Sequence, residues 1–182
     1  MSRRKTPFFA KLLVSVIYRE EERFADARER LSGLLGAVER ISGRFPFDRT
    51  DYYEREMGAP LFRRFVVIKE AVPRDALVSS KVRAEEVEAE LSFSGRRMVN
   101  LDPGLLTEEN FILATGKNYS HRVYLRDGVF ADLTLVYRKG EYLPLPWTYP
   151  DYASPAIREF LAQVREELRE GRKREGGESQ CG

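Results

Sequence analysis

The chain has 182 residues, of which 42% are hydrophobic and 12% aromatic, so it can form a core and is not an intrinsically disordered protein. Its single cysteine excludes an internal disulfide and a cysteine-based zinc site, and its single histidine excludes a poly-histidine metal centre. Of the formal net charge of +2, residues 1–6 contribute +3 and residues 171–182 contribute +1, so the body carries −2, which argues against general nucleic-acid binding.

The N-terminal half alternates predicted strands and helices. Residues 11–18 are rich in β-branched side chains and predict a buried strand, because the apolar run is far shorter than the ~20 residues that a membrane span needs. No signal-peptide cleavage pattern follows it, so we expect a cytoplasmic protein. We then expect a helix over 21–35, a strand over 37–47, a short helix over 52–57, a strand over 61–69, a helix from 73 to about 93 and a strand over 97–101.

The C-terminal half is predicted to be mainly strands, followed by one helix. Strands are expected over 110–115, 120–126 and 129–138, with a tight hairpin turn at Asp127-Gly128. After a proline- and aromatic-rich segment over 144–152, a helix begins behind Ser154 and is expected to end near Gly171. This gives a flexible segment over 1–9, one domain over 10–170, and a disordered tail over 171–182 that contains Cys181.

The order of these elements predicts an α+β fold. The first six main elements match a ferredoxin-like split βαβ core, in which an antiparallel sheet carries its helices on one face. A C-terminal hairpin or meander and a C-terminal helix would extend this core.

The hairpin contains the most informative cluster of polar residues. A two-residue turn pairs Arg126 with Val129, and this register puts His121, Asp132 and Thr134 on one face, with the more apolar opposite face toward the helices. A histidine whose ring is oriented by a carboxylate is a common general acid or base, so His121 and Asp132 are the candidate catalytic residues, and Thr134 is a candidate ligand contact beside them. The alternative is a structural polar cluster on a half-exposed sheet.

Four further residues are candidate ligand contacts beside this cluster. Lys117 and Arg122 lie close to His121 in sequence and can hold an anionic group. Asn100 and Asp102 stand at the predicted end of a strand, before Pro-Gly, where they either make a tight turn or contact a ligand. Two carboxylates alone are a weak basis for a metal site, so no metal is predicted, and the sequence indicates no particular cofactor.

The segment over 144–152 is unusual because three aromatic residues stand among three prolines. It is either a strap over the core or a wall on which a base or another ring stacks. The candidate contacts in this segment are Trp147, Tyr149, Asp151 and Tyr152.

Four stretches together resemble a known family. Residues 47–58, 99–104, 114–125 and 146–152 are similar, in this order, to a prokaryotic family of unknown function, number 4416 in its series. The resemblance covers roughly residues 10–170, and it implies no established activity.

The sequence supports two hypotheses of function. No GxxxxGK[ST], GxGxxG or GxSxG motif is present, which argues against a P-loop enzyme, a dinucleotide-binding fingerprint and a nucleophile elbow. We expect an anionic or nucleotide-like small molecule as the partner, with acid–base chemistry at His121. The alternative is a non-enzymatic RNA- or protein-interaction module, although the acidic body makes nucleic acid the weaker partner.

Overall fold

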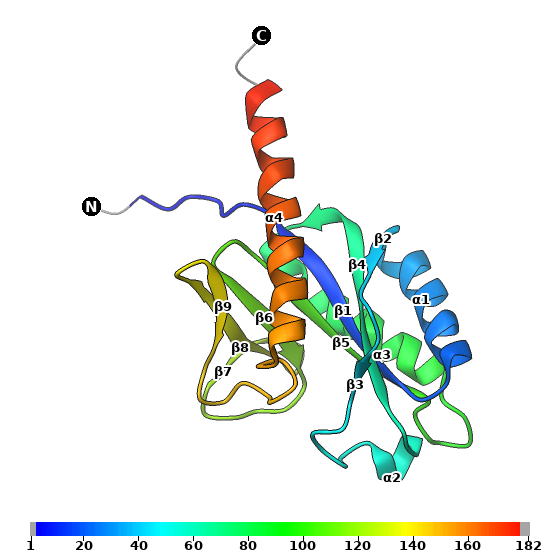
Figure 1. The fold of residues 1–182 in the computed structure, drawn as a ribbon. Coiled ribbons are helices and arrows are strands. Elements are labelled where there is room, and N and C mark those ends of the chain that lie inside the picture. The colour runs from blue at the N-terminus through cyan, green and yellow to red at the C-terminus, as the bar shows by residue number, and fades with distance from the viewer. Residues whose placement is uncertain (1–2, 179–182) are drawn as a thin grey trace.

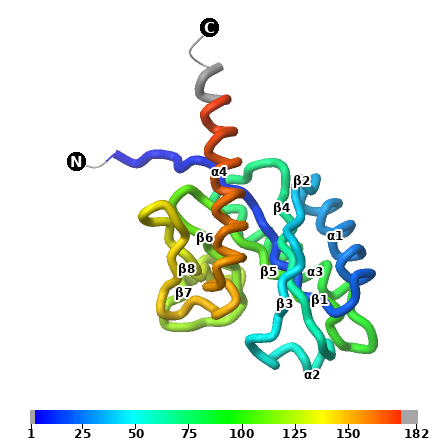
Figure 2. Tube along the Cα trace, viewed as in Figure 1, coloured from blue at the N-terminus to red at the C-terminus, as the bar shows by residue number. Residues whose placement is uncertain are grey.

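The computed structural model describes residues 3–178, which form helices packed on a nine-stranded antiparallel sheet (Figures 1 and 2). In chain order the elements are β1 (Ala10–Tyr18), α1 (Glu21–Leu35), β2 (Val38–Ile41), β3 (Phe45–Pro46), α2 (Glu54–Met57), β4 (Phe62–Val72), the 3₁₀ turn η1 (Arg74–Ala76), α3 (Leu77–Glu90), β5 (Val99–Leu106), β6 (Asn110–Thr115), β7 (Arg122–Arg126), β8 (Val129–Arg138), β9 (Glu141–Pro144) and α4 (Pro155–Glu178). The strand order is β2-β4-β1-β5-β6-β8-β7, with β3 paired to β4 and β9 paired to β8. The mixed fold and its antiparallel sheet agree with the prediction, but the sheet is larger than the predicted core.

Strand β1 lies inside the sheet, between β4 and β5, and all nine of its residues are buried. Successive side chains of a strand point to opposite faces, so a strand reads as continuously apolar only when both faces are covered. Leu12 and Val14 point into the cluster that contains α1 and α3, whereas Leu13 points into the cluster that contains α4. Helices therefore cover both faces of this sheet.

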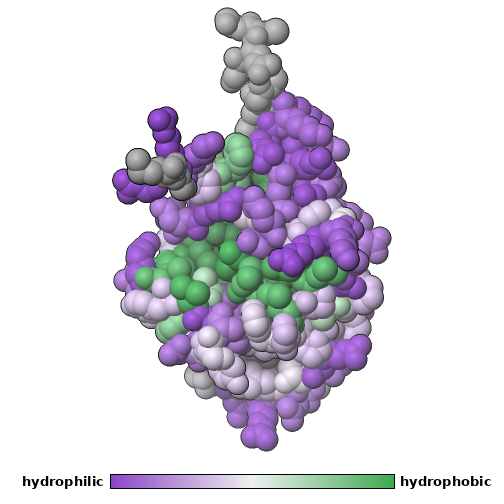
Figure 3. Space-filling model, turned by 90° about the vertical axis from the view of Figure 1, so that its left-hand side faces the viewer, coloured by the Kyte–Doolittle hydropathy of each residue, from purple (hydrophilic) through white to green (hydrophobic). Residues whose placement is uncertain are grey.

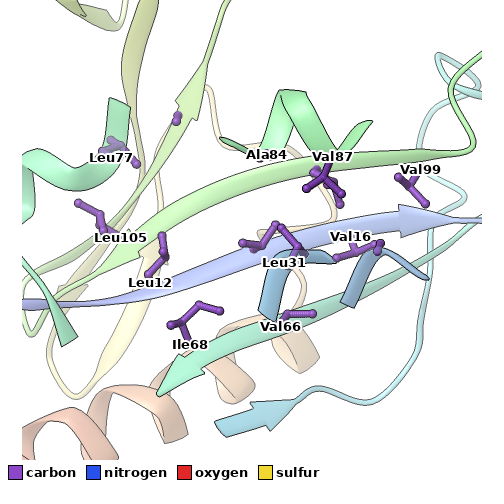
Figure 4. Packing of buried hydrophobic residues seen from close by; sticks show 14 of the residues in the cluster. Leu12, Val16, Leu31, Val66, Ile68, Leu77, Ala84, Val87, Val99 and Leu105 are labelled. Carbon is purple, nitrogen blue, oxygen red and sulfur yellow. The ribbon is translucent and has the colours of Figure 1, made fainter. Parts of the chain in front are cut away.

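The first hydrophobic cluster joins the sheet to α1 and α3 (Figure 4). Side chains from β1, β4 and β5 interdigitate there with one apolar stripe from each helix. The residues labelled in the figure are Leu12, Val16, Leu31, Val66, Ile68, Leu77, Ala84, Val87, Val99 and Leu105.

The second cluster lies under α4, which crosses the opposite face of the sheet in Figure 1. Its helix residues are Ile157, Phe160, Leu161 and Val164, and they pack on β1, β4, β5, β6, β8 and β9. The helix does not end near Gly171, as predicted, but continues to Glu178, so residues 171–178 of the predicted tail are helical. Cys181 lies outside the described residues.

Two strand boundaries were predicted wrongly. The strand expected over 37–47 is two short strands, β2 and β3, because the hydroxyl of Ser42 accepts the N–H of Phe65 at 2.9 Å and takes the place of a regular pairing. The strand expected over 97–101 is β5, and it runs on through Asp102-Pro103-Gly104, where a tight turn was one of the two interpretations. Proline is accommodated at Pro103 because β6 pairs with β5 only from Gly104 onward.

No helix within residues 3–178 is long and apolar enough to cross a membrane.

Candidate functional site

A cavity of about 570 Å³ lies where β5 and β6 separate. The two strands pair over only three residue pairs, Gly104–Leu106 with Leu113–Phe111. The part of β5 that precedes Gly104 has no partner on this side, and this free edge forms one wall of the cavity. Residues 114–117 form another wall. Side chains from α3, from residues 47–53 and from residues 149–152 also line the cavity, together with Arg63, Arg97, Arg122 and Asp132. The volume is in the range of small-molecule sites.

Most of the predicted site residues meet at this cavity, although they come from distant parts of the chain. Those that line it are Asn100, Asp102, Lys117, Arg122, Asp132, Tyr149, Asp151 and Tyr152. Three others, His121, Thr134 and Trp147, do not line it.

The register of the predicted hairpin is wrong by one residue. The turn is present, with positive φ angles of 55° at Asp127 and 76° at Gly128. However, the ladder shifts between Tyr124 and Arg126, so that Arg122 pairs with Asp132. A bulge adds one residue to one strand and moves the following side chains to the other face. Strand β7 is also exposed on both faces, with Val123 64% and Tyr124 59% exposed, so the prediction that one face of the hairpin meets the helices is wrong for this strand.

Asp132 is a buried carboxylate, and two side chains hold its Oδ2. Its Oδ2 accepts a hydrogen bond of 2.9 Å from Nε of Arg122 and lies 3.3 Å from Nε2 of His121. The predicted contact between His121 and Asp132 is therefore present. Arg122 also donates to the carbonyl oxygen of Lys117 and to the hydroxyl of Tyr149, both at 2.9 Å. Since all three of its guanidinium nitrogens have internal partners, Arg122 mainly fixes the wall of the cavity.

The ring of His121 lies behind this wall. It stacks on Trp147 with ring centres 5.0 Å apart and an interplanar angle of 12°. Trp147 in turn donates its indole N–H to the carbonyl of Leu133 at 2.8 Å. Thr134 donates to the backbone carbonyl of Asp132 at 3.0 Å. The indole hydrogen bond of Trp147 fastens the aromatic segment to β8, while Tyr149 and Tyr152 of the same segment line the cavity.

Asn100 and Asp102 belong to a chain of hydrogen bonds along the free edge of β5. Nδ2 of Asn100 donates to Asp102 at 2.7 Å, and its Oδ1 accepts from Arg97 at 3.2 Å. Arg97 forms a two-pronged pair with Glu56, and these hydrogen bonds lower the pKa of the Glu56 carboxyl. Lys81 of α3 lies 3.7 Å from Asp102.

Arg63 is a site residue that sequence analysis missed. It is 4% exposed, lines the cavity, and pairs with Asp151 at 2.7 Å. Its guanidinium also lies 4.4 Å from the ring centre of Tyr152 and 5.0 Å from that of Phe47. The only sequence signal was an arginine inside a run that otherwise predicts a buried strand.

Glu88 is the second missed residue. It lies on α3, lines the cavity, and accepts the backbone N–H of Leu101 at the free edge of β5. Burial raises the pKa of its carboxyl from 4.5 to about 7, against the lowering effect of that hydrogen bond. No sequence motif distinguishes Glu88 from the other acidic residues of this helix.

Lys117 stands at the other side of the cavity, just after β6. Its Nζ donates to the hydroxyl of Tyr52 at 2.8 Å and lies 4.2 Å from the centre of that ring. The hydrogen bond with Lys117 lowers the pKa of Tyr52.

A family model described as a domain of unknown function (DUF4416) matches residues 9–168. The chain belongs to this family. The resemblance seen in the sequence is thereby confirmed, over nearly the same residues. No curated protein and no solved structure matches the chain. The match covers β1 to most of α4, and thus every element that lines the cavity in this DUF4416 chain.

Proposed function

We propose that the protein binds an anionic small molecule in the cavity between β5 and β6. The observation that carries the proposal is Lys117, which lines the cavity and forms no ion pair with any carboxylate among the described residues. Tyr52 and Tyr149 lie beside the two basic residues of this wall, Lys117 and Arg122. An ammonium group next to exposed aromatic rings suits an anion attached to a flat ring, as in a nucleotide.

His121 enters this proposal as a positioning residue. Its Nε2 contacts Asp132, its ring stacks on Trp147, and it does not line the cavity. These contacts support a role in holding Asp132, and through it Arg122, in place. We therefore do not assign acid–base chemistry to His121.

Thermal-shift screening with inorganic phosphate, AMP and sugar phosphates tests the proposal. Binding stabilises the folded state by RT ln(1 + [L]/Kd), about 2.7 kcal/mol at a ligand concentration of 100 Kd. We expect a rise of several degrees in Tm for at least one nucleotide, and its loss in Lys117→Met. The matched control is Lys173→Met, which removes the same charge from an exposed position of α4. Equal shifts in the two variants would contradict the proposal.

A protein-interaction module is the second candidate, and it is favoured by the edge strand β7. Val123 is 64% and Tyr124 59% exposed on this strand, which ends the sheet. Figure 3 shows a hydrophobic band across the side of the molecule on which β7, β8 and β9 lie in Figure 1. Exposed edges of this kind accept a further strand. Sedimentation of the wild type and of Val123→Lys tests self-association: a dimer that the substitution dissociates supports this candidate, and a wild-type monomer removes the support for self-pairing.

We also propose that β1 to β5 form a ferredoxin-like core. The order β2-β4-β1-β5, with all pairs antiparallel, supports this proposal. So does the packing of α1 and α3 on the same face. Strands β6 to β9 then form an extension, and the cavity lies at the junction between the core and the extension.

A further inference from the structure

The charged side chains that line the cavity fall into two groups. All but two form an ion pair with a described residue. The two exceptions are Lys117 and Glu88, which have opposite charges and come from different walls of the cavity. Lys81 is shared between Glu85 and Asp102, and each of the other paired cations has a carboxylate partner, so Lys117 and Glu88 are the charged groups that remain to pair with a bound molecule.

Glu88 is placed to accept a hydrogen bond from a ligand. One carboxylate oxygen, Oε1, is occupied by the N–H of Leu101, and no cation among the described residues pairs with this carboxylate. Burial without a cationic partner is also the main cause of its raised pKa. A donor group in the cavity would relieve this cost, because a hydrogen bond to the charged form favours that form.

We propose that the ligand is bipolar: its anionic group pairs with Lys117, and its other end presents a nitrogen hydrogen-bond donor to Glu88. This inference rests on the proposed function and adds the class of ligand. An aminated heterocycle joined to a phosphate has both features, whereas a phosphate compound that presents only carbonyl oxygens at its far end lacks the donor.

Two matched ligand pairs test the inference by isothermal titration calorimetry. The first pair is AMP and purine riboside 5′-monophosphate, and the second is CMP and the 5′-monophosphate of pyrimidin-2-one riboside. The two members of a pair carry the same phosphate and differ only in the exocyclic amino group, so the second member has no N–H on its base. We expect the aminated member of at least one pair to bind about tenfold more tightly to the wild type, which corresponds to 1.4 kcal/mol. Glu88→Gln should reduce this ratio to below about threefold. The control Glu86→Gln, which changes an exposed carboxylate on the same helix outside the cavity lining, should leave it unchanged.

Proton release gives a second readout that needs no variant. A donor that pairs with Glu88 favours its charged form, so aminated ligands should release protons at pH 7, detected as a dependence of the binding enthalpy on the buffer. Equal affinities within both pairs, together with weaker binding by Lys117→Met, would overturn the bipolar ligand and leave anion binding intact. If none of the four nucleotides bound, both the bipolar ligand and the binding of nucleotides in this cavity would be overturned.

Discussion

Arg63 and Asp151 form a buried ion pair in the floor of the cavity, with side-chain exposures of 4% and 9%. Asp151 was a predicted site residue, but its partner stands almost ninety positions earlier in the chain, on β4. No local pattern encodes such a contact, because it depends on how α4 and the aromatic segment return over the sheet. The residue type was therefore predictable and the pairing was not.

Asp151→Asn should be strongly destabilising. The amide retains the hydrogen bond that Oδ1 accepts from the N–H of Tyr152, but it leaves the charge of Arg63 without its counter-ion. Breaking a buried ion pair on one side typically costs about 3–5 kcal/mol. Urea unfolding measures this loss, and Glu90→Gln, in the exposed pair with Arg30, is the control, with an expected loss below about 1 kcal/mol. If Asp151→Asn lost no more free energy of unfolding than the control, the prediction that Arg63 and Asp151 form a strongly stabilising buried pair would be wrong.

Glu88 should make stability depend on pH. Its folded-state pKa, about 7, lies above the ordinary value of 4.5, so the folded state binds the proton more tightly. The protonated Glu88 therefore contributes to the free energy of unfolding. This contribution is fully present below about pH 4.5 and is lost as the pH rises through about 7. Because Glu88 is half-buried and partly screened by solvent, the contribution to the free energy of unfolding is on the order of 2 kcal/mol.

Unfolding of the wild type and of Glu88→Gln between pH 4.5 and pH 8 measures this term. Glutamine stays neutral, so the variant should gain stability relative to the wild type as the pH rises. A difference in the free energy of unfolding that stays constant across this pH range would contradict the raised pKa of Glu88.

At the scale of elements, regular periodicity made most helices and strands predictable. The bounds of α1 agree with the prediction residue for residue, and those of β6 and β8 also agree. The errors lie where a single residue alters a ladder: the shift next to Leu125 changes the hairpin register, and Ser42 interrupts the predicted second strand. Pro103-Gly104 resembled a turn because the sequence does not say which edge of β5 is free.

Helix α4 provides a prediction at this scale. Gly171 lies within the helix, and a Cβ added there meets no atom within 4 Å. Gly171→Ala should therefore stabilise the protein, by about 0.5–1 kcal/mol if the helix is fully formed at this position. Urea unfolding and helical circular dichroism measure the effect. Gly128→Ala, in the hairpin turn with φ of 76°, should lose stability in the same assay. No gain for Gly171→Ala would mean that α4 frays before this residue.

At the scale of the whole molecule, the separation of the charge into tails and body has a measurable consequence. Residues 1–6 carry +3, whereas the body is slightly negative. Any weak binding of the full chain to single-stranded RNA at low salt should disappear when residues 1–6 are removed, and in the full chain when salt is raised to about 200 mM. Fluorescence anisotropy measures both effects. Binding that survives the deletion would restore the RNA-interaction alternative.

The convergence of distant motifs is the part of the site that only the whole fold determines. Sequence patterns selected residues around positions 100, 117, 132 and 150, and the structure brings them to one cavity. Those patterns also selected His121, the only histidine, which the structure places behind the cavity wall. An unusual residue type is a signal in a sequence, but access to a cavity depends on packing.

The short ladder between β5 and β6 has a mechanical consequence. Only three residue pairs join these strands, and Gly104 lets the ring of Phe111 approach closely, since a Cβ there would lie 2.7 Å from it. The two parts of the sheet are also joined by the hydrophobic cluster under α4 and by the first cluster, in which Ala114 and Val129 pack with residues of β1, β4 and β5. A molecule bound between Lys117 and Glu88 would bridge the gap between β5 and β6. Ligand binding would therefore reduce the mobility of β6, β7 and β8 rather than change their mean positions.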